Sequence, residues 1–499
     1  MIMKKIYILY ILFVLIKFEL AGNQLKWAAD AEGNAPYIFQ DPNSPQNLLG
    51  FEKDIIEEIS KILKLKPVFI QNQWDGLIPG LYRMDYDVAA NGIEITPERE
   101  KEVLFSIPYY ITHLTIVIKN NNNYISNFQD LINKKVGVLK NSLAERILLK
   151  EAKIKTLTYE GEINAFEDLK NGRIDAVLAD DPIVLYYLPF NNDLKALTDE
   201  IGEAKYGIAI RKNDLELKDK IDSALKLIIK SGKLREILES WKLWNNQMKD
   251  YTFDYSESNI LPINYNNYVN LEIKNISIEE RIVRYISFFP LIIQATIVTL
   301  QISTLSMLLA IVFGLFLALF RLYIPSPFNK ISILYIEIIR GTPLLIQLFF
   351  IFYALPSIGI NFSPFVAAIL GLGLNYAAYE AENYRAGLLA VPKGQFEAAL
   401  ALGLNRRQSL RYIILPQALR IVIPPVTNDF ISLLKDSSLV SVITLVELTK
   451  LYTQLSATYF DYIGTGIIIA LVYLLLGLPF IRFSNYFEEK FKYDKKVLK

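Results

Sequence analysis

The chain carries few side chains suited to covalent or metal chemistry. It has no cysteine, which excludes disulfides, thiolate metal sites, cysteine nucleophiles and a lipid-modified cysteine. Its single histidine, His113, cannot build a histidine metal cluster, and we expect a packed or surface residue near a strand. The G-x-x-x-x-G-K-[ST] sequence that cradles nucleotide phosphates does not occur. We therefore expect no cofactor, no metal and no ATP hydrolysis by this chain.

Two charged stretches remain as candidates for binding chemistry. The first is NGIEITPERE, residues 91–100, which follows a predicted strand, and its alternative interpretation is a solvated loop. The second is EAALALGLNRRQSLRYIILP, residues 397–416, which places three arginines and a glutamate inside an otherwise apolar region. An ordinary amphipathic loop helix is the alternative there. The elements around each stretch decide between these interpretations.

Composition divides the chain into two dissimilar halves. The 499 residues are 52% apolar, and residues 24–260 are rich in charge whereas 285–481 contain long uncharged runs. The formal net charge of +1 gives no basic excess, which argues against a nucleic-acid partner. Lys4 and Lys5 precede an apolar run to Ile16, as in an export signal. The cleavage pattern is poor, so an uncleaved signal anchor in 1–23 stays open.

Residues 24–245 predict an α/β domain. Short apolar runs such as 88–90, 114–118, 136–139 and 176–178 alternate with helix-period segments such as 54–64. This order is typical of mostly parallel sheets, in which ligands bind at strand ends.

Several motifs follow one another at family-like spacing in this domain. They are GFEKD (50–54), WDGLIPGL (74–81), Asp87-Val88, ITPER (95–99) and PYY (108–110). Together they resemble the polar amino-acid-binding proteins of ABC importers over nearly the whole domain. The resemblance implies a two-lobed periplasmic-binding-protein fold and a zwitterionic ligand, with residues from about 119 to 205 forming the second lobe. A ligand that touches both lobes would stabilise the closed form.

The resemblance also implies site residues. Arg99 matches the arginine that forks onto the ligand α-carboxylate, and Asp180 matches the carboxylate that receives the α-ammonium. Asp181 is the alternative to Asp180, but we expect it to be a turn or cap residue. Three other positions also match. Trp74 matches an aromatic residue that lines the ligand, Gly92 a glycine that lets a backbone carbonyl approach, and Asp30 a residue that contacts the ligand side chain. Tyr37 joins the wall or the core.

Four positions depart from the family pattern and leave the particular amino acid open. Asn34 replaces a common aromatic residue, Glu94 replaces a small hydroxyl residue, and Ala179 precedes Asp180 where larger residues occur. The second-lobe loop beginning at Lys140 lacks glycine. Glu94 either favours a cationic ligand side chain or pairs with Lys140 and leaves the pocket neutral.

The second half predicts an all-α polytopic membrane domain after a polar linker at 246–284. Uncharged stretches at 285–320, 344–379 (two spans, with a loop near 357–364) and 462–481, with a further apolar segment near 418–434, indicate about five membrane spans. Basic residues gather after the first span, in the region 385–411 and after residue 481. By the positive-inside rule these loops and the tail at 486–499 are cytosolic, and the N-terminal domain lies outside.

The stretch that begins at Glu397 can then be interpreted. Glu397, Ala398, Ala399 and Gly403, followed by Ile413 and by Leu415-Pro416, fit the EAA loop of ABC importer permeases at every defining position. In that family the loop forms a short coupling helix that sits in a groove of the ATPase subunit. We expect the helix to begin near Glu397, with Ala399 and Gly403 one turn apart on a bare strip and Pro416 as a break. EIIRGTPLLIQLFF (337–350) and AAYEAENYRAG (377–387) resemble the polar amino-acid branch.

The sequence therefore resembles a fusion of an amino-acid-binding protein with a type I ABC importer permease covering 285–485, in the cytoplasmic membrane. The resemblance implies two copies of a separate ATP-binding subunit, a homodimer of this chain, membrane lipid and a small amino acid as partners. The alternatives are a ligand-gated channel and an amino-acid sensor. A channel pore would interrupt the clamp sequence, whereas here ITPER and DAVLADD both precede the first span.

Overall fold

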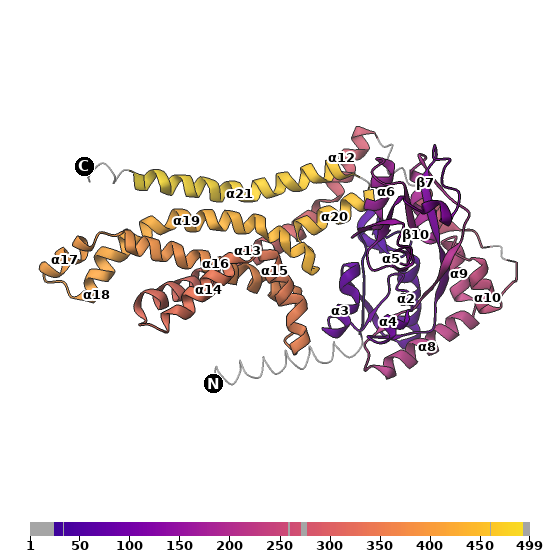
Figure 1. The fold of residues 1–499 in the computed structure, drawn as a ribbon, viewed down its shortest axis with the longest axis horizontal. Helices are drawn as coiled ribbons and strands as arrows, with labels where there is room; N and C mark the ends of the chain where they lie inside the picture. The colour runs from indigo at the N-terminus through magenta and orange to yellow at the C-terminus, as the bar shows by residue number, and fades with distance from the viewer. Residues whose placement is uncertain (1–23, 33, 258–259, 271–276, 460, 493–499) are drawn as a thin grey trace. The chain divides into compact units, whose positions relative to one another are not determined.

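The computed structural model describes residues 24–32, 34–257, 260–270, 277–459 and 461–492, and these residues form two compact units. The N-terminal unit runs to Phe288 and includes Gln454–Asp461, and the second unit holds Phe289–Thr453 and the residues from Tyr462. Figure 1 traces both units from indigo to yellow. The predicted export signal at 1–23 and the end of the predicted tail lie outside the described residues.

The first lobe of the N-terminal unit is assembled from segments that are distant in sequence. Its sheet has the order β4-β1-β5-β13-β6, so strands on either side of the second lobe meet in one sheet. The strands are β1 Gln24–Ala29, β4 Lys66–Gln71, β5 Val88–Ala89, β6 Leu104–Phe105 and β13 Ala209–Ile210. A hairpin of β2 Phe39–Asp41 and β3 Ser44–Leu49 lies off this sheet, and the helices are α2 Phe51–Leu63, α3 Leu77–Tyr82, α4 Pro97–Glu100, α8 Leu215–Lys230 and α9 Lys233–Ser240.

The second lobe is a separate sheet of order β11-β7-β10-β8-β9, with β12 also paired to β7. Its strands are β7 Tyr110–Lys119, β8 Lys135–Leu139, β9 Lys155–Tyr159, β10 Ala176–Asp180, β11 Leu194–Ala196 and β12 Ile201–Tyr206. Helices α5 Leu143–Leu149, α6 Glu162–Lys170 and α7 Asp181–Tyr187 accompany it (Figure 1). The lobe thus begins at Tyr110, earlier than the predicted boundary near 119.

Both sheets are mixed, so the prediction of mostly parallel sheets is wrong. β10 pairs parallel with β8, and β8 with β9, but β7 is antiparallel to β10, β11 and β12. In the first lobe β13 is antiparallel to both β5 and β6. The physical reason is the crossing between lobes, because a strand that returns from the other lobe enters the sheet from the opposite end.

Apolar burial explains these elements. In β7, Leu114, Ile116 and Ile118 face one hydrophobic cluster while Val117 faces another, so both surfaces of this strand are covered. In α2 the buried residues recur at helical spacing, with Ile55, Ile56 and Ile59 on one face.

The segment expected to be a polar linker contains helices that pack on the N-terminal unit. α10 Asn246–Thr252 buries Met248, and α11 Ile263–Val269 buries Tyr268. The Tyr268 ring lies 5.2 Å from the ring of Phe39 and 5.0 Å from that of Tyr186. Aromatic residues therefore pack this segment onto the N-terminal unit, although its overall polarity predicted a linker.

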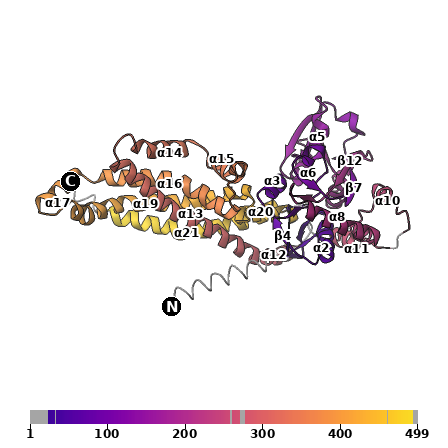
Figure 2. The same ribbon diagram turned by 90° about the horizontal axis from the view of Figure 1, so that it is seen from below.

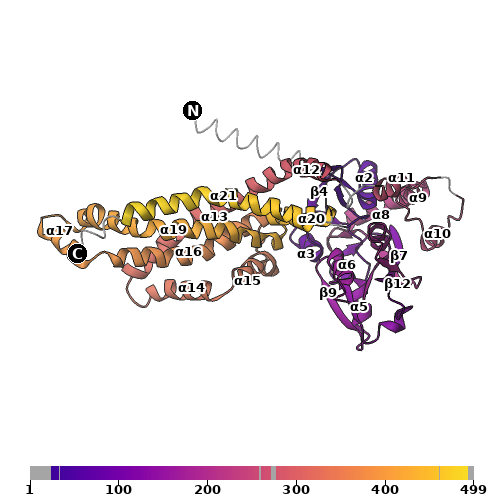
Figure 3. The same ribbon diagram turned by 90° about the horizontal axis from the view of Figure 1, so that it is seen from above.

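The second unit is helical. Its long helices are α13 Phe289–Tyr323, α14 Asn329–Gly341, α16 Pro364–Ala390, α19 Leu415–Asp436 and α21 Tyr462–Lys492. The shorter ones are α15 Leu344–Phe349, α17 Lys393–Ala401 and α18 Arg406–Ser409, and α12 Ile278–Ser287 and α20 Leu448–Tyr459 belong wholly or partly to the N-terminal unit. Figures 2 and 3 show α13, α16, α19 and α21 running side by side. Buried alanines at 310, 318, 377, 378 and 381 let α13 and α16 approach closely.

Length and hydropathy identify two membrane-crossing helices among the described residues, Phe289–Tyr323 and Tyr462–Phe487. The helices Asn329–Gly341 and Leu344–Ala354 qualify only as a pair, which bends by 107° at the break. The bend falls at Thr342 and Pro343, where proline lacks the N–H needed to continue a helix. The charges of α14, Lys330, Glu337 and Arg340, gave no sign that it belongs to this span. The predicted total of five spans, which needs α16 and α19 as well, stays a prediction.

Candidate functional site

The predicted ligand-binding residues lie on loops that follow strands of the two lobes. In the first lobe, Asp30 follows β1, Trp74 follows β4 and Gly92 follows β5. In the second lobe, Lys140 follows β8 and Asp180 ends β10. Strand ends thus bring together residues separated by up to 150 positions, as open α/β sheets do.

Arg99 is positioned by a short helix and is engaged by Glu94. Thr96 caps α4, and its Oγ1 accepts a hydrogen bond of 3.3 Å from the Arg99 backbone N–H. The Arg99 guanidinium forms an ion pair with the Glu94 carboxylate, and its Nη1 also donates to the Glu94 carbonyl oxygen at 3.1 Å. Glu94 therefore pairs with Arg99, and the alternative pairing with Lys140 is wrong.

Glu94 also receives groups from the second lobe. Its Oε1 accepts a hydrogen bond of 2.8 Å from the Leu143 backbone N–H, and Arg146 Nη2 lies 3.8 Å from its Oε2. Burial alone would raise the pKa of Glu94, but the positive charges of Arg99 and Arg146 outweigh burial and hold this pKa below its ordinary value. The carboxylate is ionised and joins the two lobes.

Asp180 lies in a contrasting environment, because tyrosines contact it and no cation does so among the described residues. Its Oδ2 accepts hydrogen bonds from Tyr206 at 2.7 Å and from Tyr37 at 3.2 Å. Burial, and then the negative charge of Glu94, raise the pKa of Asp180 to about 7. Asp181 instead begins α7, and its Oδ1 accepts a hydrogen bond of 3.0 Å from Thr115.

Trp74 and Lys140 connect the lobes. Trp74 Nε1 donates to the Lys140 carbonyl oxygen at 3.0 Å, and the Trp74 ring lies 5.4 Å from the Arg99 guanidinium carbon. The Lys140 ammonium lies 3.0 Å from Asp75 Oδ2 and 2.9 Å from Glu160 Oε1. Lys140 thus holds the closed arrangement through its backbone and its side chain.

Asp30 and Asn34 support the loops of the first lobe. Asp30 accepts hydrogen bonds from Gln71 Nε2 at 2.9 Å and from the Trp74 backbone N–H at 3.1 Å. Asn34 Nδ2 donates to the Asp30 carbonyl oxygen at 2.8 Å. These contacts fix the position of the Trp74 ring.

Gly92 is required by conformation and by space. Its φ is +61°, and an added Cβ would lie 3.0 Å from the Tyr37 ring. Its N–H donates to Glu52 Oε1 at 2.6 Å, and burial raises the pKa of Glu52 to about 7. Glycine therefore allows Tyr37 to reach Asp180.

Four further residues lie at this site that no sequence pattern predicted as site residues: Glu52, Arg146, Glu162 and Tyr206. Glu162 is 8% exposed at the start of α6, and burial together with the charges of Asp180 and Glu94 raises its pKa well above the ordinary value. Only GFEKD carried a usable signal, because it placed Glu52 in a family motif. Arg146 and Glu162 sit on surface-like helical stretches whose pattern gives no sign of the cleft.

The predicted coupling segment forms a helix, with two differences from expectation. α17 begins at Lys393, so Glu397 lies in its middle, and Gly403 lies beyond its end with φ +86°. Ala399 and Gly403 therefore do not share one helical strip, because a left-handed glycine terminates the helix. Pro416 lies in the first turn of α19, where a missing N–H is tolerated. Figure 1 shows α17 and α18 at one end of the helical unit, where Glu397 and Ala398 are exposed.

Charged residues of the helical unit mostly have partners. Glu382 forms ion pairs with Arg321 and Arg385, and Asp429 accepts a hydrogen bond of 2.8 Å from Asn383. Glu337 and Arg340, one turn apart, form no ion pair among the described residues, and the Arg340 guanidinium lies 5.3 Å from the Tyr379 ring.

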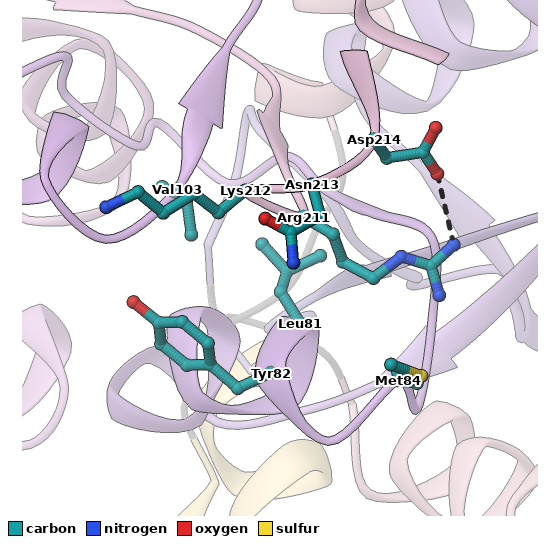
Figure 4. Close-up of a pocket in the computed structure, with 8 residues that line it drawn as sticks. All are labelled: Leu81, Tyr82, Met84, Val103, Arg211, Lys212, Asn213 and Asp214. Carbon is teal, nitrogen blue, oxygen red and sulfur yellow. Dashed lines mark hydrogen bonds and ion pairs between the residues drawn. The ribbon is translucent and has the colours of Figure 1, made fainter. Parts of the chain in front are cut away.

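A separate hollow of about 430 Å³ lies on the first lobe. Figure 4 shows its lining, in which Arg211 and Asp214 interact at 3.4 Å. The residues that line it are Leu81, Tyr82, Met84, Val103, Arg211, Lys212, Asn213 and Asp214. The predicted ligand-binding residues do not line this hollow.

Comparison with known proteins places each half of the chain in a family. Residues 25–243 match the bacterial extracellular solute-binding proteins, family 3. Residues 310–493 match the binding-protein-dependent transport system inner membrane component.

Individual relatives match either half. The chain is 39% identical to the L-cystine transport system permease protein TcyB of Bacillus subtilis over 197 residues, which are 38% of this chain and 84% of that protein. It is 39% identical to the glutamine transport system permease protein GlnP of Escherichia coli K12 over 191 residues, 38% of this chain and 87% of that protein. The ABC transporter arginine-binding protein 1 of Escherichia coli K12 is 32% identical over 209 residues, 41% of this chain and 85% of that protein.

Among solved structures, an ancestral arginine-binding protein bound to arginine is 36% identical and covers 44% of this chain and 98% of its own, with a TM-score of 0.41. The curated relatives match over most of their own length in both halves. The chain therefore belongs to the amino-acid ABC importer family, and it joins a family 3 solute-binding domain to a binding-protein-dependent permease domain in one polypeptide.

Proposed function

We propose that this chain captures a polar amino acid outside the cytoplasmic membrane and passes it through its own helical unit, driven by a separate ATP-binding subunit. The observation that supports the proposal best is the separation of charge in the closed clamp. Guanidinium groups gather at Glu94, whereas Asp180 lies 2.7 Å from a tyrosine hydroxyl and has no cation within ion-pair distance in the described part of the chain. A zwitterion carries the two complementary groups.

In this proposal the α-ammonium of the ligand binds Asp180, and its α-carboxylate joins Glu94 at the guanidinium of Arg99. Trp74 stacks on Arg99 and closes the side of the cleft. Four other residues contribute indirectly, because they hold the loops of the site in place. They are Gly92, Asp30, Asn34 and Lys140. The ligand would form charge-assisted hydrogen bonds with both lobes only in the closed clamp. It would therefore bind the closed form more tightly than the open form and stabilise it.

Binding can be tested on the full chain in lipid nanodiscs. All four tryptophans, Trp27, Trp74, Trp241 and Trp244, lie in the N-terminal unit, so tryptophan emission reports on the clamp alone. We expect a saturable emission change with amino acids and none with sugars or dipeptides. Saturation by sugars or dipeptides alone would contradict the proposal.

The chain is a multi-pass protein of the cytoplasmic membrane with an extracytoplasmic binding domain. We propose as domain boundaries 1–23 for the export signal, 24–245 for the clamp, 246–284 for the connecting segment and 285–485 for the permease domain, followed by a cytosolic tail. A homodimer with two ATP-binding subunits would supply the two permease units that such importers use.

The proposed coupling contact can be tested with single cysteines, because the chain has none of its own. Ala398→Cys, on exposed α17, should cross-link to the ATP-binding subunit and resist membrane-impermeant reagents added from outside. Asn361→Cys, in the exposed loop before α16, should react from outside and form no such cross-link. The opposite labelling pattern would refute the orientation and the contact.

A further inference from the structure

The closed cleft holds an unequal set of charges on its two sides. On one side, the guanidinium groups of Arg99 and Arg146 share the single carboxylate of Glu94. Arg146 Nη2 is buried without a hydrogen-bond partner, although it lies 3.8 Å from Glu94 Oε2. A buried donor without an acceptor is costly, so a further carboxylate on this side would satisfy it.

On the other side, two carboxylates lie close together without a positive partner. Asp180 is bound by the hydroxyl groups of Tyr37 and Tyr206, and Glu162 interacts with the Asp180 backbone N–H. Neither carboxylate belongs to any ion pair of the described residues. Lys140, the nearby lysine of the predicted site, is occupied by Asp75 and Glu160. Two positive groups of a ligand would therefore compensate this side.

Asp30 stands at the family position that contacts the ligand side chain, but its carboxylate does not decide which ligand charge is preferred. Asp30 accepts hydrogen bonds from the N–H groups of Glu32 and Trp74 at 3.1 Å and from Gln71 at 2.9 Å. Its carboxylate is thus already used to hold the loops of the first lobe. Selection by charge must come from the groups that face each other across the cleft.

We propose that the ligand is an amino acid of net charge +1, whose carboxylate binds between Arg99 and Arg146 and whose two cationic groups bind Asp180 and Glu162. The proposal rests on the amino-acid-binding function above and names Glu94, Arg146 and Glu162 as residues that determine specificity. A neutral amino acid would leave one buried carboxylate uncompensated, and an anionic one would leave two. An unpaired buried charge is strongly unfavourable.

The proposal is tested by ligand titration of the full chain in nanodiscs, followed by tryptophan emission, at pH 8. The probes are lysine and arginine, glutamine as the neutral ligand, glutamate as the anionic ligand, and cadaverine as a lysine without its carboxylate. We expect lysine or arginine to bind at least tenfold more tightly than glutamine, and glutamate not to bind. Cadaverine should bind at least tenfold more weakly than lysine.

Two substitutions should change the preferred ligand charge. Glu162→Gln removes one negative charge from the ammonium side, so lysine should weaken at least tenfold while glutamine keeps or gains affinity. Glu94→Ser frees both guanidinium groups, and the preference for lysine over glutamine should fall at least tenfold. Asp168→Asn is the matched control on α6, because this carboxylate already pairs with Arg173 at 2.7 Å, and its ligand ranking should not change.

The outcomes separate the two proposals. If the native chain binds glutamine as tightly as lysine, the charge inference fails while amino-acid binding stands. If the native chain binds no amino acid, the proposed function itself fails. The panel on the native chain decides the charge inference even where a substituted chain unfolds, which its thermal transition would reveal.

Discussion

The substitution Asp180→Asn separates the binding role of this residue from its effect on stability. Burial and the charge of Glu94 raise the pKa of Asp180 from 3.8 to about 7, so the empty clamp holds an ionised carboxylate at pH 8 at a cost in stability. One pKa unit corresponds to about 1.4 kcal/mol, which sets a ceiling of about 4 kcal/mol for this cost. Asparagine keeps an oxygen that accepts from Tyr37 and Tyr206 and carries no charge.

We expect Asp180→Asn to raise the free energy of unfolding of the empty clamp by about 1 to 4 kcal/mol at pH 8. The sign follows from proton binding. Between about pH 4 and 7 the folded state binds more protons than the unfolded state, so the native clamp loses stability as the pH rises, and the variant lacks this loss. The difference between the two proteins should therefore be small near pH 4, grow to about pH 7 and stay constant above it.

The same substitution should weaken ligand binding. A hydrogen bond to a charged group is worth about 1.5 to 3 kcal/mol, or roughly 10- to 150-fold in affinity. Urea unfolding followed by tryptophan emission in nanodiscs measures stability at pH 5 and pH 8, and titration measures affinity. Asp181→Asn serves as the control, since this neighbour bonds Thr115 outside the cleft. Loss of stability in Asp180→Asn at pH 8, or a difference without pH dependence, would refute the reasoning.

Three further substitutions test other contacts. Gly92→Ala, at φ +61° and 3.0 Å from the Tyr37 ring, should destabilise the clamp by about 1 to 3 kcal/mol in the same urea assay, and unchanged stability would contradict the steric argument. Trp74→Phe removes the bond to the Lys140 carbonyl between the lobes and should weaken ligand binding by about 0.5 to 1.5 kcal/mol, chiefly through faster ligand release in stopped-flow measurements. Gly403→Ala, at φ +86°, should loosen the end of α17 and lower substrate-stimulated ATP hydrolysis by the reconstituted complex, whereas full stimulation would exclude a role for this cap.

Much of the fold could be predicted from local sequence patterns. The alternation of short apolar runs with helical segments predicted an α/β domain, because burial on a strand and on a helix each leaves its own period, and the two lobes followed only from the family resemblance. The mixed direction of the sheets could not be predicted in this way. Strand direction depends on how often the chain crosses between lobes, and β7 pairs with β12 across about 80 residues of intervening chain.

The site was only partly predictable for the same reason. Arg99 and Asp180 stand in motifs, and the structure places both in the cleft. Arg146 and Glu162 carry no local sign of their position, because their neighbours in space come from other segments. The pairing of Glu94 with Arg99 instead of Lys140 likewise depended on the closure of the two lobes, which no spacing in one segment encodes.

The end of α17 in the helical unit was likewise not predictable from local sequence. The EAA pattern located the exposed helix α17, but it suggested that Gly403 continues that helix. The structure gives Gly403 a left-handed conformation that ends it. A glycine four residues after an alanine fits either a smooth helical strip or a terminated helix, and only the backbone conformation distinguishes them.

The central claim is that one polypeptide both captures an amino acid and conducts it across the membrane under the power of a separate ATPase. Proteoliposomes that contain the full chain and its ATP-binding subunit, with the clamp facing the interior, provide the most direct test. Radiolabelled lysine or arginine, present at equal concentration on both sides with ATP outside, should accumulate outside against its gradient, and Asp180→Asn should sharply reduce this accumulation at subsaturating ligand. Equal transport without the ATP-binding subunit, or no transport of any amino acid with it, would contradict the account.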